Sequence, residues 1–245
     1  MDLVDALIRG QIIALGGGGF SMEPDNLALD RYVLEQARHV EPAVAFLPTA
    51  RGDAEDYIAR FYAAFTTLPC RPSHVPLFRR TTNLREHLLA QDVLYVGGGN
   101  TRSMLAVWRE WSIPDLLREA WEAGTVLAGV SAGAICWFEQ GVTDSLAERL
   151  TALDGLGLLS GSCCPHYDGE PERRPEYHRL LAAGSIAGGI AIDDGAAVHF
   201  RGTAIHAIVA SRPGASAYRV RVEGGAVRED GLPARLLPVC GSERN

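Results

Sequence analysis

A Gly-x-Ser-x-Gly element occupies residues 129–133, a spacing that can present a serine hydroxyl as a nucleophile. An apolar run rich in β-forming residues, 125–130, leads into it, and a helix-compatible segment, 132–138, follows. Strand, tight turn and helix in this order are what a nucleophile elbow requires. The amide after the serine would then face a developing oxyanion at the helix N-terminus. We therefore predict Ser131 as the nucleophile and Ala132 as an oxyanion donor, although a glycine-rich chain also produces this pattern by chance.

A serine nucleophile needs a general base within hydrogen-bond reach. Of the seven histidines, His166 is the best candidate, because it lies in the loop-like segment 161–170 directly after Pro165. Proline restricts the local backbone and can fix the direction of the imidazole. The remaining histidines have ordinary explanations as residues of polar helix ends, exposed faces or apolar strands: His39, His74, His87, His178, His199 and His206.

The base in turn needs a carboxylate that sets its tautomer and stabilises its protonated form. Asp194 follows the strand-like run 189–193, and Asp144 lies shortly after the elbow helix, in 141–145. Either aspartate could instead cap a turn. A strand end is a rigid support for an orienting group, so we prefer Asp194 and keep Asp144 as the alternative.

No metal or cofactor is expected. The adjacent Cys163 and Cys164 cannot easily chelate one tetrahedral ion, and no second ligand pair completes a set. The glycine runs at 16–19 and 97–99 lack the third glycine of a dinucleotide fingerprint, and the chain has no phosphate-binding Gly-Lys-Ser/Thr loop.

Composition excludes several classes of partner. The chain has 245 residues, of which 47% are hydrophobic, and a net charge of −7. That charge argues against nucleic acid or an anionic membrane as the main partner. No apolar run approaches the roughly 18 to 20 residues of a membrane span, and residues 1–10 do not resemble a signal peptide. Five unevenly spaced cysteines favour a reduced, cytoplasmic chain.

Strand-like and helix-like segments alternate along most of the chain. Strands are expected at 11–15, 43–47, 74–78, 92–96 and 125–130, and helices at 26–38, around 57–65, and after an Asn100 or Thr101 cap. Such alternation indicates an α/β fold, in which helices cover both faces of a parallel sheet. Beyond residue 185, the segments 190–192, 197–200, 203–209 and 217–222 are expected to form antiparallel hairpins added to the sheet. We expect one domain over 1–245, with the hairpins starting at about 186.

Three unusual segments follow strands of this expected sheet: the glycine run 16–19, the loop 97–101 and the elbow at Ser131. Ligands of open parallel sheets bind beyond the carboxyl ends of the strands. The three segments are therefore expected to converge on one site.

Residues 97–101, 129–134 and 164–167, in this order, resemble the peptidase E family of serine peptidases, the aspartyl dipeptidases, to which cyanophycinase is related. The segments 16–20 and 46–50 also resemble this family, so the resemblance runs from about residue 10 to about residue 200. It implies a three-layer, flavodoxin-like fold related to class I glutamine amidotransferases, with a sheet that is parallel but mixed at its edge. Serine replaces cysteine at the elbow.

The resemblance also implies roles. Ser131 would attack the scissile carbonyl, His166 would be the general base, and the amide of Gly98 or Gly99 would complete the oxyanion hole with Ala132. Asp194 matches the acid of cyanophycinase, whereas Asp144 matches an aspartate proposed for peptidase E.

Aspartyl dipeptidases hold the acidic N-terminal side chain of the substrate with an arginine that follows the catalytic histidine. Arg174 is the nearest match, at a shorter spacing than in peptidase E, so other small peptides are also expected as substrates. Asn100, in the loop after Gly99, is a second candidate for substrate binding.

We expect a cofactor-free serine hydrolase that cleaves short peptides through an acyl-enzyme, with Asp-X dipeptidase as the finer form. A cyanophycinase-like β-aspartyl peptidase and a small-molecule amidase are alternatives within this class. A non-catalytic ligand-binding protein on the same fold is the alternative from another class. The expected partner is a small peptide, and a homodimer is compatible with the sequence.

Overall fold

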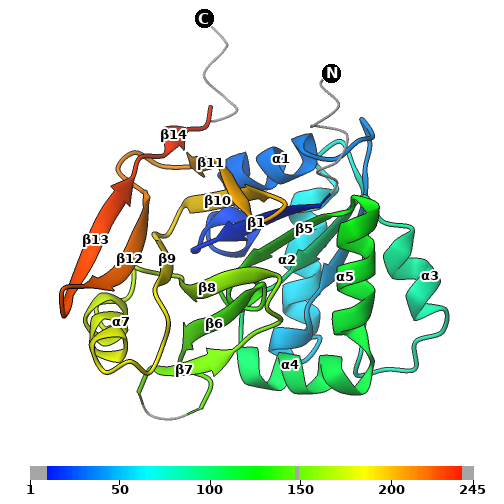
Figure 1. Cartoon of the computed structure of the whole chain (residues 1–245). Coiled ribbons are helices and arrows are strands. Elements are labelled where there is room, and N and C mark those ends of the chain that lie inside the picture. The colour runs from blue at the N-terminus through cyan, green and yellow to red at the C-terminus, as the bar shows by residue number, and fades with distance from the viewer. Residues whose placement is uncertain (1–9, 147–148, 239–245) are drawn as a thin grey trace, which may run out of the picture.

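The computed structural model describes residues 10–146 and 149–238, and its centre is an eight-stranded sheet (Figure 1). The strand order is β14-β11-β10-β1-β5-β4-β2-β3. The strands are β1 (Gln11–Leu15), β2 (Ala43–Leu47), β3 (Arg71–His74), β4 (Val93–Val96), β5 (Val126–Val130), β10 (Ala196–Arg201), β11 (Ala204–Ala210) and β14 (Arg235–Leu236). The strands from β1 to β5 are parallel, whereas β10 pairs antiparallel with β1 and β11 antiparallel with β10. The expected parallel sheet with a mixed edge is confirmed.

Helices cover both faces of this sheet. They are α1 (Ala28–Glu35), α2 (Glu55–Phe65), α3 (Leu84–Leu89), α4 (Thr101–Glu110), α5 (Ile113–Ala123), α6 (Ala132–Ile135) and α7 (Arg173–Ala182), with short 3-10 turns η1 (Gly19–Ser21) and η2 (Thr49–Arg51). Alternate residues of β1 enter different cores: Ile13 packs with α1 and α2, and Ile12 packs with α4 and α5. Figure 1 shows α2 behind the strands and α5 in front of them.

A second, six-stranded sheet, with strand order β13-β12-β9-β8-β6-β7, lies beside the first. Its strands are β6 (Phe138–Thr143), β7 (Thr151–Asp154), β8 (Leu159–Cys164), β9 (Gly189–Ile192), β12 (Ala217–Glu223) and β13 (Ala226–Leu232). The sequence predicts β9 and β12 as hairpin strands of the central sheet, which is wrong. β9 instead pairs in parallel with β8, and β12 pairs with β9 and β13.

Two further expectations need correction. The elbow helix ends at Ile135 and not near 138, because the carbonyls of Cys136, Trp137 and Phe138 accept hydrogen bonds from the amides of residues 156–159. The third strand is β3 and not 74–78. The chain leaves the sheet after His74, since Asp53 Oδ2 accepts the amides of Leu77 and Phe78, at 2.5 and 2.9 Å.

Both sheets contribute to one apolar core, in which Phe138 of β6 meets Phe200 of β10 edge-on. α7 packs on the other face of the second sheet through Tyr177, Leu180 and Leu181. The single domain over 1–245 stays a prediction, because it includes residues outside the described ranges.

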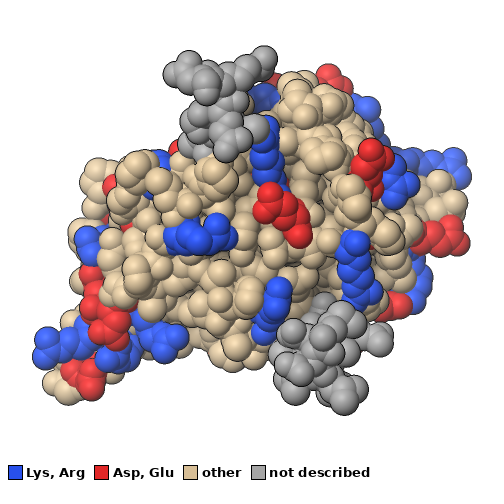
Figure 2. All heavy atoms as spheres, turned by 90° about the horizontal axis from the view of Figure 1, so that it is seen from above, with Lys and Arg blue, Asp and Glu red and all other residues tan. Residues whose placement is uncertain are grey.

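Charges on the described surface are mixed. Figure 2 shows basic and acidic side chains scattered over one face without a continuous basic area, and the β12–β13 hairpin projects at its left. On that hairpin Arg221 pairs with Glu223 and Asp230. Of the helices in 10–146 and 149–238, none is long and apolar enough to cross a bilayer.

Candidate active site

Ser131 occupies the turn between β5 and α6, half-buried, with φ of 57° and ψ of −112°. This strained backbone is uncommon for a residue with a side chain and is typical of functional sites. The flanking glycines permit it: a Cβ on Gly129 would lie 2.3 Å from the carbonyl oxygen of Gly133, and one on Gly133 would lie 2.4 Å from that of Val96. This is the geometry that a nucleophile elbow requires.

The end of β1 forms main-chain hydrogen bonds with both Ser131 and His166. The amide of Ser131 donates to the carbonyl of Leu15 at 3.1 Å, and the amide of His166 donates to the carbonyl of the next residue, Gly16, at 3.3 Å. His166 is 8% exposed and has φ of 55°, so its backbone is also in the left-handed region. Serine and histidine that are 35 positions apart in sequence thus attach to consecutive residues of one strand end.

The imidazole of His166 is paired with Asp194. Its Nδ1 lies 2.6 Å from Asp194 Oδ1, and the two side chains are 10% and 20% exposed. Gly17 bridges Asp194 in parallel and accepts the amide of Gly195 at 3.0 Å, so the same strand end also holds the acid. A carboxylate at Nδ1 fixes the tautomer whose Nε2 is free to accept a proton.

Two residues that the sequence did not single out support this pair. Asp168 Oδ1 accepts the amide of Asp194 at 2.8 Å, and its Oδ2 pairs with Arg212 at 2.5 Å. Asp168 lies two positions after His166, and this short spacing is the sequence signal that could have identified it. The position of Arg212 depends on tertiary structure alone.

Asp144, the alternative acid, lies elsewhere. It follows β6, is exposed, and lines a hollow with Arg149, Glu172 and Glu176. The structure therefore places Asp194, and not Asp144, against the imidazole of His166, and it joins the main chains of Ser131 and His166 to consecutive residues at the end of β1. The catalytic roles of Ser131, His166 and Asp194 stay predictions.

The loop after β4 lies against the serine. A Cβ on Gly98 would be 3.2 Å from Ser131 Cβ and 3.7 Å from its Oγ. The amide of Gly98 donates to the hydroxyl of Tyr57 at 3.0 Å, and that hydroxyl also shares a 3.1 Å hydrogen bond with Ser21 Oγ. Burial raises the pKa of Tyr57, which keeps the hydroxyl protonated. The sequence predicts only that Tyr57 lies at the start of a helix, and nothing local revealed this contact.

Gly98 therefore already has an acceptor. Within 10–146 and 149–238 no acceptor is found for the amide of the next residue, Gly99, which is exposed and has φ of 138°. Ala132 is the first residue of α6, where an amide has no acceptor within the helix. Because the amide of Gly98 is bound to Tyr57, we predict the amides of Gly99 and Ala132 as the pair of oxyanion donors.

The two candidates for substrate binding have structural contacts of their own. Asn100 caps α4, since its side chain accepts the amide of Ser103 at 2.8 Å, as the sequence predicts. Arg174, on α7, directs Nε and Nη2 at the two carboxylate oxygens of Glu229, at 3.0 and 2.5 Å. Its guanidinium also lies over the rings of Tyr167 and Tyr218. The substrate-binding roles of Asn100 and Arg174 stay predictions.

Glu229 holds Arg174 firmly. Although burial raises the pKa of Glu229, hydrogen bonds from Arg174, Tyr167 and His178 lower it to about 2. The carboxylate is therefore ionised at neutral pH, and Arg174 would have to leave it to reach a substrate.

The cysteines near the site are poor nucleophiles. Cys136, Cys163 and Cys164 are buried, and burial raises the pKa of the Cys164 thiol to about 12. Among the described residues, no group of three or more His, Cys, Asp or Glu side chains is arranged to hold a metal ion.

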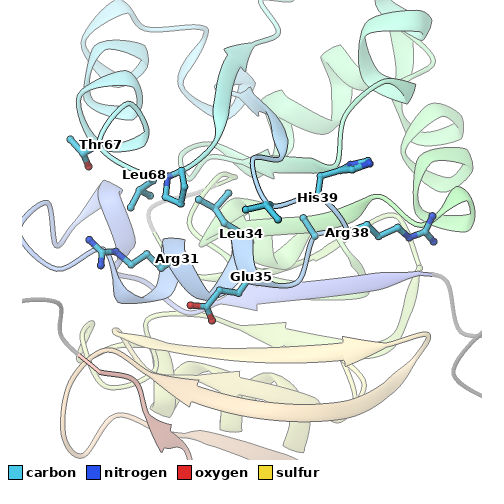
Figure 3. A pocket seen from close by; sticks show the side chains of 10 residues that line it. Arg31, Leu34, Glu35, Arg38, His39, Thr67 and Leu68 are labelled. Carbon is cyan, nitrogen blue, oxygen red and sulfur yellow. The ribbon is translucent and has the colours of Figure 1, made fainter. Parts of the chain in front are cut away.

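The pocket in Figure 3 is separate from these groups. Arg31, Leu34, His39 and Leu68 line it where α1 ends and the chain enters β2. This is the amino end of the parallel strands, whereas Ser131 follows the carboxyl end of β5.

The chain is similar to known peptidases. The model of peptidase family S51 matches residues 12–208. The uncharacterized peptidase YgaJ of Bacillus subtilis (strain 168) is 55% identical over 228 residues, which are 93% of this chain and 99% of that protein.

Two solved structures share the fold. A peptidase from an acI-B1 Actinobacterium has a TM-score of 0.70 at 20% identity, over 92% of this chain and 94% of that one. A candidate peptidase E protein from Listeria monocytogenes EGD-e has a TM-score of 0.61 at 22% identity, over 82% and 98%.

Proposed function

Since the chain belongs to peptidase family S51 and is a serine-type peptidase, we propose that it hydrolyses short peptides through an acyl-enzyme on Ser131. The observation that carries this proposal is the 2.6 Å contact between His166 Nδ1 and Asp194 Oδ1, beside a strained serine on the same strand end. Acyl transfer needs a nucleophile, a general base and an acid that orients the base.

The mechanism has two steps. In the first, His166 Nε2 takes the proton of the Ser131 hydroxyl as its oxygen attacks the scissile carbonyl, and Asp194 stabilises the imidazolium that forms. The amides of Gly99 and Ala132 donate to the oxyanion, and their positions are set before reaction. The imidazolium then protonates the departing amine. In the second step, water attacks the acyl-enzyme with the same histidine as base, and the serine is restored.

Hydrolysis of a dipeptide panel tests this function. Asp-Leu, Glu-Leu, Ala-Leu and β-Asp-Arg are incubated with the wild type and with Ser131→Ala, without added metal. We expect at least one peptide to be cleaved and cleavage to be lost in the variant. Cleavage of Asp-Leu alone would establish Asp-X specificity, and cleavage of β-Asp-Arg alone would establish a cyanophycinase-like activity.

Covalent labelling provides an independent readout. A fluorophosphonate should modify the wild type at Ser131 and leave His166→Ala unlabelled, because the serine is activated by its base. A wild type that neither cleaves the panel nor reacts with the probe would contradict the proposed function and favour a ligand-binding role.

A further inference from the structure

Arg51 lies against the loop that we assign to the oxyanion hole. The carbonyl of Ala50 accepts the amide of Asn100 at 2.8 Å, which joins η2 to this loop. A Cβ on Gly99 would lie 2.3 Å from that carbonyl oxygen and 2.9 Å from Arg51 Cγ. The side chain of Arg51 therefore starts beside the proposed oxyanion donor.

Its guanidinium extends over Tyr57. Arg51 Cζ lies 4.9 Å from the centre of the Tyr57 ring, and the hydroxyl of this ring accepts the amide of Gly98. Gly98 in turn contacts Ser131. A cation–π contact with a buried ring restrains the charged group. The exposed side chain of Arg51 therefore holds a positive charge over the tyrosine that supports the Gly98–Ser131 contact.

Three arginines on the segments around His166 and Asp194 are paired with acids. Arg173 binds Glu170 at 2.5 Å, and Arg174 and Arg212 bind Glu229 and Asp168, also at 2.5 Å. Among the residues that the structure describes, no carboxylate pairs with Arg51. In a chain with 30 acidic and 23 basic residues, an arginine without an acidic partner beside the 97–101 loop is a ready binding group for an anion.

We propose that Arg51 binds a carboxylate of the peptide substrate, beside the loop that receives the scissile carbonyl. The inference rests on the proposed function. A guanidinium can hold a carboxylate through two parallel hydrogen bonds. That carboxylate is either the free C-terminus of a dipeptide or the acidic side chain of its N-terminal residue, and matched substrates distinguish the two.

The test uses two substrate pairs. Ala-Leu and its C-terminal amide differ in the terminal carboxylate, whereas Asp-Leu and Asn-Leu differ in the side-chain carboxylate. Arg51→Gln should lower kcat/KM about 10- to 100-fold for the carboxylate member of one pair, with little change for its neutral twin. The substrate pair whose carboxylate member loses kcat/KM shows which carboxylate Arg51 binds. Arg51→Lys keeps the positive charge but not the planar guanidinium, so its kcat/KM for the carboxylate member should lie between those of the wild type and Arg51→Gln.

Arg60→Gln is the matched control. Its guanidinium also lies over the Tyr57 ring, at 5.1 Å, but it reaches Asp56 and the carbonyl of Ser21 at 3.5 Å. The Arg60→Gln variant should keep the substrate preference of the wild type. Equal losses for both members of each pair in Arg51→Gln, or unchanged preferences, would overturn the assignment of Arg51 while hydrolysis itself stands.

Protection from labelling separates the two proposals where turnover is slow. The same four peptides should slow fluorophosphonate labelling of wild-type Ser131, and Arg51→Gln should lose the advantage of the carboxylate member. If all four peptides slow the labelling of the wild type equally, the proposed role of Arg51 is contradicted, while the proposed hydrolysis is not. Absence of both labelling and hydrolysis contradicts the proposed function, and the role of Arg51 with it.

Discussion

Oδ1 of Asp194 lies 2.6 Å from Nδ1 of His166, and both residues are held by the glycines that follow β1. The contact distinguishes between the two acids that the sequence leaves open. It also makes the site unusually sensitive to small changes in backbone and side chain at a few positions, which can be tested one at a time.

Asp194→Asn should lower kcat by roughly 10³- to 10⁴-fold, because an amide at this position no longer enforces the reactive tautomer of His166. Asp144→Asn should retain nearly full kcat, since Asp144 is exposed and away from the imidazole. Steady-state kinetics of both variants on the best substrate of the dipeptide panel makes the comparison. Equal losses would contradict the assignment of the acid.

Gly17→Ala should lower kcat on the order of 10²-fold, as expected for a displaced catalytic group. An added Cβ would lie 2.0 Å from Asp194 Oδ1 and 2.9 Å from His166 Nδ1, so the two side chains must separate. Gly231→Ala is the control, because a Cβ there meets nothing within 4 Å. Activity and thermal unfolding are measured together, and a fully active Gly17→Ala would refute the idea.

Tyr57→Phe should lower kcat by about tenfold and the free energy of unfolding by about 1–3 kcal/mol, because the buried amide of Gly98 loses its acceptor. Tyr62→Phe on the same helix removes a hydroxyl that contacts His74 instead, at 2.9 Å. It should cost stability without a comparable loss of kcat. The kcat of each variant is measured together with its urea unfolding. Equal kcat values for Tyr57→Phe and Tyr62→Phe would contradict the role of the Tyr57 hydroxyl at the site.

Asp30 should make stability depend on pH. This fully buried carboxyl accepts the amide of Phe20 at 2.8 Å and the hydroxyl of Tyr95 at 3.1 Å, and burial raises its pKa to about 7. Between about pH 4, its usual pKa, and pH 7 the folded state retains a proton that the unfolded state loses. The free energy of unfolding should therefore fall as pH rises through this window, by at most about 1.4 kcal/mol per pH unit.

Asp30→Asn removes this dependence with little change of shape. Urea unfolding of both proteins from pH 4.5 to 8 gives the difference between their stabilities, in which contributions from other titrating groups cancel. The difference should change across the window. Parallel curves would show that Asp30 does not titrate there.

Much of the central sheet is predictable because its signals are local. The bounds of β1 and β2 match the predicted strands, since a buried parallel strand is a short apolar run ended by glycine or proline. The second sheet is not predictable in this way. Its strand β9 pairs with β8 through Ser162 and Gly189, and pairing between distant segments leaves no mark on the pattern of either strand.

The site divides in the same way. Ser131, His166 and Asp194 each follow a recognisable local pattern, and the structure brings the last two into contact. Tyr57 and Arg51 carry no such pattern: a tyrosine in an apolar helix face looks like core, and a lone arginine looks like surface. Their contacts with the 97–101 loop exist only once β2 and β4 pair.

The order of the elements along the chain has a consequence for synthesis. β1 is made early, but its two neighbours in the sheet are β5 and β10, and Leu15 pairs with Val130 on one side and Ala197 on the other. When the ribosome has synthesised Ser131 and His166, Asp194 and β10, the second neighbour of β1 in the sheet, have not yet been made. Under the proposed mechanism, the growing polypeptide still lacks the acid that orients His166, and we expect peptide hydrolysis only after β10 has been synthesised and has folded onto β1.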